Sequence, residues 1–116
     1  MEKKFLINGK ENTEYQIKFS PNCLIEIENI CNYINVVLKA EKASNKLRSR
    51  IIDKVIQLKY SPKIYTEIGK TDKLKRVYRR IVIGNYIILY TIIEEDKVVL
   101  ISHMYYSGKN YLEELL

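Results

Sequence analysis

Hydrophobic residues follow two different spacings along this chain, and each spacing predicts a different kind of element. Near the N-terminus Tyr15, Ile17 and Phe19 alternate with polar residues, which is the period of a strand with one buried face. Ser20 and Pro21 follow, a residue type that caps helices and then the residue favoured in the first helical turn. We therefore expect a strand over about residues 15–19 that leads directly into a helix.

The stretch that follows has the helical period throughout. Apolar residues recur at spacings of three and four on two stripes, the first consisting of Leu24, Ile27, Cys31, Ile34 and Leu38 and the second of Ala40, Ala43, Leu47, Ile51, Val55 and Leu58. The first stripe predicts a helix from about Pro21 to Leu38, and Tyr60-Ser61-Pro62 ends the second helix. A short connection near residues 39–42 would fold the two helices into an antiparallel hairpin.

The last third of the chain reads as three short strands separated by two tight turns. Gly84-Asn85 lies between runs rich in Ile, Val and Tyr, and a glycine that opens a two-residue turn suits a type II′ hairpin. Glu95-Asp96 makes the second reversal. On residues 86–93 both alternating sets are apolar, so both faces of the sheet need cover. Two helices cover one face only, and the other is predicted to bind a protein partner or a second copy of the chain.

The order of strand, two helices and three strands predicts a single α+β domain. It would consist of an N-terminal strand, an antiparallel helical hairpin and a three-stranded antiparallel meander, all forming one antiparallel sheet with the hairpin on one face. We assign residues 15–116 to this domain and residues 1–14 to an N-terminal extension. Asn8-Gly9 next to an apolar run is consistent with an extra hairpin strand in the extension.

The composition is that of a soluble globular protein, with 47% hydrophobic and 29% charged residues in 116. No apolar run approaches the length of about 20 residues that a membrane span needs, or the secretory core of about 7 to 15. The protein is therefore expected in the cytoplasm, away from membranes.

Positive charge is concentrated in one segment. Residues 59–80 hold eight basic and two acidic residues, which accounts for the whole net charge of +6. A basic segment that leads into a sheet favours a polyanionic partner, either a nucleic acid or an acidic protein surface. The alternative is a solvated segment that only keeps this basic protein soluble.

Few side chains suggest chemistry. Cys23 and Cys31 are eight positions apart on one predicted helix, too far to form a disulfide, and the single histidine cannot complete a zinc site. We expect neither metal nor cofactor, and two cysteines that pack as small apolar residues. His103 is expected on the same strand face as Val99 and Ile101, where it is either a structural residue or a catalytic base.

Arginines and tyrosines border the last strands. Arg79 and Arg80 are adjacent, so only one of them can face any given site. Arg80 could instead pair with Glu94 or with an acidic group of a partner. The remaining aromatics could stack on bases or pack against the helices; they are Tyr105, Tyr106 and Tyr111.

Several segments together resemble the RelE/ParE superfamily of type II toxin-antitoxin toxins. They are Tyr15-Gln-Ile-Lys-Phe-Ser-Pro21, Tyr78-Arg-Arg-Ile-Val-Ile-Gly-Asn-Tyr-Ile-Ile-Leu-Tyr90 and His103-Met-Tyr-Tyr-Ser-Gly-Lys-Asn-Tyr111. The likeness covers about residues 15–116. It implies a small cytoplasmic toxin that inhibits growth or stabilises a plasmid, neutralised by a cognate antitoxin that wraps around it. Without the antitoxin, a homodimer would cover the apolar sheet face.

The superfamily has two branches, and the resemblance leaves the target open. ParE-like toxins block DNA gyrase, whereas RelE-like toxins cut mRNA on the ribosome. RelE-like nucleases commonly carry an arginine just after the hairpin tyrosine, and this chain has Ile87 after Tyr86. The resemblance therefore favours a binder, or an inactive member that only partners its antitoxin. If the chain is a nuclease, the catalytic residues would be Arg80, His103 and Tyr111. Residues that would bind the target or a nucleic acid are Lys73, Lys75, Arg76, Arg79, Tyr105 and Tyr106.

Overall fold

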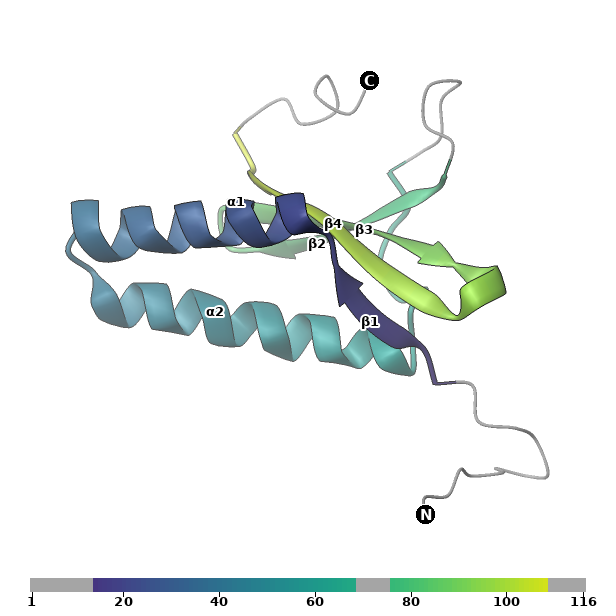
Figure 1. The fold of residues 1–116 in the computed structure, drawn as a ribbon. Helices are drawn as coiled ribbons and strands as arrows, with labels where there is room; N and C mark the ends of the chain where they lie inside the picture. Colours follow the sequence, from purple (N-terminus) through teal and green to yellow (C-terminus); the bar gives the residue numbers. More distant parts are fainter. Residues whose placement is uncertain (1–13, 69–75, 109–116) are drawn as a thin grey trace, which may run out of the picture.

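The computed structural model describes residues 14–68 and 76–108 (Figure 1). The elements are β1 (Gln16–Phe19), α1 (Pro21–Asn32), α2 (Glu41–Ile56), β2 (Tyr78–Ile83), β3 (Tyr86–Ile93) and β4 (Val98–Tyr106). A π-helical stretch, Tyr33–Val37, extends α1, and short 3-10 turns follow α2 and β3 at Gln57–Lys59 and Glu94–Asp96. This order confirms the predicted α+β fold. The N-terminal extension lies outside the described residues except for Glu14.

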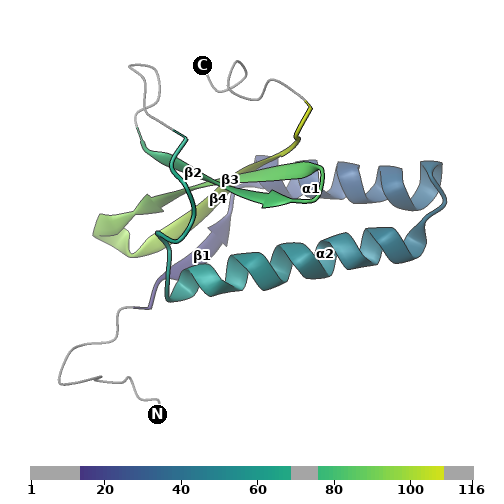
Figure 2. The same ribbon diagram turned by 180° about the vertical axis from the view of Figure 1, so that it is seen from behind.

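The helical hairpin is confirmed, and its two ends show how the sequence specifies it. At the start of α1, Ser20 Oγ accepts a hydrogen bond from the Cys23 N–H at 3.0 Å and donates one to the Ser102 carbonyl at 2.8 Å. At the tip, Lys39 has a left-handed φ of +54°, which turns the chain into α2. Figures 1 and 2 show that this tip projects beyond the strands. Among the described elements, no helix is long and apolar enough to cross a membrane.

The buried stripes differ from the predicted ones at a few positions. Ile27, Cys31 and Ile34 are buried as expected, as are the last four residues of the second stripe, Leu47, Ile51, Val55 and Leu58. Leu24 is exposed because the buried face of α1 begins one residue earlier, at Cys23, and Leu38 is exposed at the end of the π-helical stretch, where the chain turns toward α2. On α2, Ser44 replaces Ala43 on the buried face and satisfies its hydroxyl by donating to the Cys31 carbonyl at 2.9 Å.

The sheet has the strand order β1-β4-β3-β2. The meander β2-β3-β4 is antiparallel as predicted, but β1 pairs with β4 in parallel, so the expectation of a wholly antiparallel sheet was wrong. The helical hairpin returns the chain to the end at which β1 begins, where the Tyr15 N–H donates to the Lys59 carbonyl at 2.8 Å. The strand β2 therefore runs in the same direction as β1. After the two reversals of the meander, β4 runs in that direction too and pairs with β1 in parallel.

The two predicted turns are present, and a β-bulge changes one prediction. Gly84 has a φ of +58° while Asn85 has no positive φ, as in a type II′ turn. In the β3-β4 ladder Leu89 pairs with His103 and Tyr90 with Ile101, which leaves Ser102 as the extra residue. The bulge reverses the alternation after Ile101. His103 therefore faces away from the helices, and its predicted place on the face of Val99 and Ile101 was wrong.

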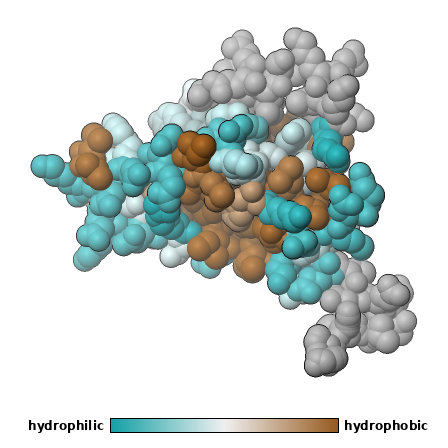
Figure 3. All heavy atoms as spheres, in the orientation of Figure 1, coloured by the Kyte–Doolittle hydropathy of each residue, from teal (hydrophilic) through white to brown (hydrophobic). Residues whose placement is uncertain are grey.

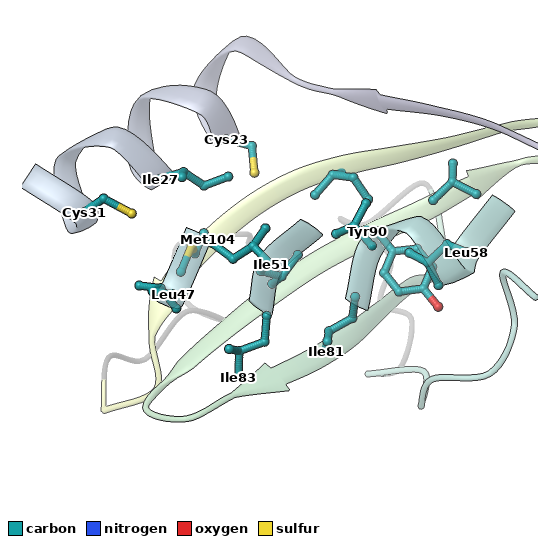
Figure 4. Close-up of a cluster of buried hydrophobic side chains, with 14 of the residues drawn as sticks. Cys23, Ile27, Cys31, Leu47, Ile51, Leu58, Ile81, Ile83, Tyr90 and Met104 are labelled. Atoms are coloured by element: carbon teal, nitrogen blue, oxygen red, sulfur yellow. The ribbon is translucent and has the colours of Figure 1, made fainter. Parts of the chain in front are cut away.

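The helices cover one face of the sheet. Side chains from α1, α2 and the inner face of the sheet point into one layer, which includes Cys23, Ile51, Ile81, Tyr90 and Met104 (Figure 4). A smaller cluster on the other face consists of Ile87, Leu89 and Tyr105, with Ile68 and Tyr78 packed against it.

The sheet face opposite the helices is less open than the sequence suggested. Ile87 and Leu89 are 6% and 0% exposed and Val82, which pairs with Ile87, is 54% exposed, so among the described residues this face has less exposed apolar surface than expected. Large exposed apolar side chains are instead concentrated on the helical hairpin and its tip, at Leu24, Ile25, Tyr33, Val36, Val37, Leu38, Ile52 and Ile56.

Candidate functional site

Three strands bring Arg80, Leu89 and His103 into one row on the face opposite the helices. Arg80 pairs with Leu89 across β2 and β3, and Leu89 pairs with His103 across β3 and β4. Neighbouring strands lie about 4.8 Å apart, so the backbones of Arg80 and His103 are roughly 10 Å apart. Arg80 is exposed, Leu89 is buried and the His103 side chain is 24% exposed. The bulge at Ser102 thus places two of the predicted catalytic residues on the same face.

His103 is held from two sides. Its ring stacks on Tyr105 with centroids 5.3 Å apart and planes 12° apart. Its Nδ1 lies 3.4 Å from Glu26 Oε2, while Glu26 Oε1 accepts the Met104 N–H at 2.9 Å. The pairing of β1 with β4 ends at Ile101. Beyond that point the Glu26 carboxylate, from α1, accepts a backbone hydrogen bond at the edge of β4.

The sequence did not identify Glu26 as part of the site, because its contacts with His103 and Met104 join residues that are 77 and 78 positions apart in the chain. Its only local signal is a charge placed between the buried Cys23 and Ile27. That signal does not identify a partner.

Arg79 points away from the row and binds the chain itself. Its Nη1 donates to the carbonyls of Tyr65 at 2.7 Å and Lys63 at 3.2 Å, and its Nη2 forms an ion pair with Glu67 at 3.0 Å. The Arg79 side chain is only 15% exposed. The guanidinium therefore holds the segment of residues 63–67 against β2, and binding of a target by Arg79 stays a prediction.

The basic segment is partly neutralised within the described chain. Lys59 pairs with Glu14 at 3.1 Å and Lys63 with Glu94 at 3.5 Å. Lys63 and Glu94 line a groove of about 370 Å³ that carries both signs of charge, with the exposed Arg76 also in its lining. Lys73 and Lys75 lie outside the described residues. The described part of the segment is thus a mixed surface rather than a purely positive one.

Tyr105 and Tyr106, two of the tyrosines considered for stacking on bases, lie on opposite faces of the sheet. Tyr105 is buried beside His103, whereas Tyr106 is 56% exposed and meets Tyr86 edge-on at 6.0 Å. Tyr111 lies outside the described residues. Ile87, at the position where a RelE-like arginine was considered, is buried against Tyr105.

No metal-binding cluster accompanies the row. Across residues 14–68 and 76–108, no group of three or more His, Cys, Asp or Glu side chains could hold a metal ion. The arrangement can offer one guanidinium and one imidazole to a bound molecule.

Comparisons with known proteins agree on the fold. The solved chromosomal ParDE toxin-antitoxin system from P. aeruginosa aligns with a TM-score of 0.65 at 11% identity, covering 81% of this chain and 97% of that one. The archaeal RelE-RelB complex from Pyrococcus horikoshii aligns with a TM-score of 0.55 at 16% identity, covering 83% and 98%. The isolated E. coli RelE toxin gives a TM-score of 0.56 at 17% identity, covering 86% and 92%.

The sequence itself decides the family. No curated protein matches the chain. The family described as the ParE toxin of the type II toxin-antitoxin system parDE matches residues 17–111, which is most of the chain and includes every described strand and helix except the first residue of β1. The chain therefore belongs to the ParE toxin family of type II toxin-antitoxin systems.

Proposed function

We propose that this toxin stops growth by inhibitory binding to a cellular protein such as DNA gyrase, and that a cognate antitoxin neutralises it. The observation that carries the proposal is the composition of the row. Arg80 is its one guanidinium, Arg79 is engaged on the other face, and the buried Ile87 lies two residues from Leu89 on the same face. Phosphoryl transfer depends on several positive charges placed on the phosphate, and the described part of the row supplies few.

A supercoiling assay tests this proposal. Purified toxin is added to gyrase, ATP and relaxed plasmid, and the product topology is read on a gel. We expect supercoiling to fall as the toxin concentration approaches that of gyrase. Full supercoiling in the presence of a large excess of folded toxin would exclude gyrase as the target.

The runner-up function is ribosome-dependent cleavage of mRNA. It is favoured by one observation, the placement of Arg80 and His103 in one row with Tyr105 stacked on the imidazole. If it holds, Arg80→Ala or His103→Ala should reduce cleavage by translating ribosomes about a hundredfold, as for a lost charge stabiliser or proton donor. Uncut mRNA with the wild-type toxin would reject it.

A growth experiment distinguishes an active toxin, whether binder or nuclease, from an inactive member of the family that only binds its antitoxin. Induction of the toxin alone should arrest growth, and co-expression of the small protein encoded beside it should restore growth. Normal growth in cells that accumulate the folded protein would identify an inactive member.

A further inference from the structure

Four basic residues of α2 recur every four positions and form a stripe that winds slowly around the helix. We call this set the basic stripe, and its members are Lys42, Lys46, Arg50 and Lys54. Four residues of an α-helix rise about 6 Å, so the basic stripe is about 18 Å long. Lys54 is partly buried and the other three residues are exposed. The stripe therefore presents evenly spaced cations along most of the helix.

The basic stripe lies on a side of α2 that α1 does not cover. Arg48 pairs with Glu28 of α1, and Arg50, two positions later, is about 200° away around the helix. Arg50 reaches the β2–β3 turn instead, where its Nη1 lies 3.6 Å from the place that a Cβ of Gly84 would occupy. Figure 3 shows hydrophilic side chains over the first half of α2, where the stripe begins. A partner can thus contact the stripe without displacing α1.

The charges of the basic stripe are not neutralised by the described part of the chain. None of its four cations forms an ion pair within residues 14–68 and 76–108, whereas Lys59, Lys63 and Arg79 each pair with a carboxylate. Asp53 is the one acidic residue of α2 beyond its first turn. Like charges four positions apart repel one another on a helix, and a bound anion relieves that repulsion. Positive charge available to a partner is therefore gathered on α2, although the sequence placed it in residues 59–80.

The spacing of the cations and the lack of aromatic residues on α2 select the partner. Duplex DNA carries one negative charge per about 1.7 Å of its axis, so about ten phosphates lie along a stripe of about 18 Å. Single strands are bound by aromatic side chains that stack on their bases, and α2 contains no aromatic residue. We propose that the basic stripe binds the phosphate backbone of duplex DNA without reading its sequence. The choice of DNA rests on the proposed function, because gyrase acts on duplex DNA.

The basic stripe and the row of Arg80 and His103 are separate surfaces. The row is on the sheet face that the helices leave uncovered, whereas the stripe is on α2 itself. A toxin that holds its protein target with one surface can therefore hold the DNA on that target with the other.

The test measures the affinity of purified toxin for a short duplex DNA of random sequence by fluorescence anisotropy at several salt concentrations. Contacts with four phosphates predict a slope of about −3.6 for log affinity against log salt. Raising the salt from about 50 to about 200 mM should then weaken wild-type binding about 150-fold. The double variant Lys46→Gln/Arg50→Gln keeps two of the four cations, so its slope should be about −1.8 and its loss over that range about 12-fold.

The double variant Arg48→Gln/Lys59→Gln is the matched control. It removes the same amount of charge, but from cations that are already paired, Arg48 with Glu28 and Lys59 with Glu14. Its slope should stay at about −3.6, because neither residue belongs to the basic stripe. Unchanged melting temperatures establish that both double variants fold.

The outcomes separate this inference from the proposed function. The basic stripe is wrong if the wild type binds no duplex at the lowest salt, if Lys46→Gln/Arg50→Gln keeps the wild-type slope, or if the control loses as much. Equal affinity for polyglutamate would identify a site for acidic proteins, and tighter binding of a single strand of the same length would identify a single-strand site. Either result would overturn the assignment to duplex DNA. Gyrase that supercoils fully beside a toxin with the expected slopes would reject gyrase as the target and leave the stripe in place.

Discussion

Burial sets the properties of the Cys23 thiol. It raises the thiol pKa from 9.0 to about 12, with a smaller contribution from the nearby Glu26 carboxylate. Below pH 9 the folded and unfolded states both carry the proton. Above it the unfolded state loses the proton first, so the native thiol contributes less stability as the pH rises toward about 12. We expect the difference in unfolding free energy between wild type and Cys23→Ala to shrink over that range. Denaturant titrations at pH 8 and pH 11 check this, and a difference that stays constant would contradict it.

Arg79 is expected to act on stability rather than on target chemistry. Arg79→Ala removes hydrogen bonds to two carbonyls and an ion pair, and it leaves the partly buried Tyr65 carbonyl without its donor. The loss should be about 1–3 kcal/mol of unfolding free energy. Arg50→Ala, at an exposed position on α2, is the control and should cost about 0.5 kcal/mol or less. Equal unfolding midpoints for the two variants would refute the structural role of Arg79.

At the scale of elements, the tip of the hairpin stores backbone strain. Lys39 adopts a φ of +54°, a conformation that costs most L-residues about 1 kcal/mol and glycine almost nothing. Lys39→Gly should therefore raise the unfolding free energy by up to about 1 kcal/mol. Lys42→Gly, in the first turn of α2, should lower it by a similar amount. Thermal melts of both variants test this prediction. Destabilisation by Lys39→Gly would show that backbone strain at residue 39 does not determine its effect on the unfolding free energy.

The sequence predicted the helices, strands and turns well because neighbouring residues determine where these elements begin and end. Ser20-Pro21 begins α1 as a cap and first-turn proline would, and the Gly84-Asn85 turn joins β2 to β3. The parallel pairing of β1 with β4 and the bulge at Ser102 depend on contacts between distant segments. The sequence therefore could not show that His103 changes face.

At the scale of the whole molecule, the family and the α+β architecture follow from the order of the elements, whereas the site follows only in part. Arg80 and His103 were predicted and share a row, but Glu26 reaches His103 only through the packing of α1 on the edge of β4. The sequence predicted that Arg79 and Arg80 face opposite sides of the sheet, and the register shows that Arg80 is the one in the row with His103.

Mapping of mRNA 5′ ends in cells shortly after induction of the toxin tests the central claim most directly. A toxin that acts by binding arrests growth without cutting mRNA, so we expect no cuts at fixed codon positions while growth has stopped. Discrete codon-positioned cuts in the wild type that vanish in Arg80→Ala would contradict the account and establish the row as a nuclease site.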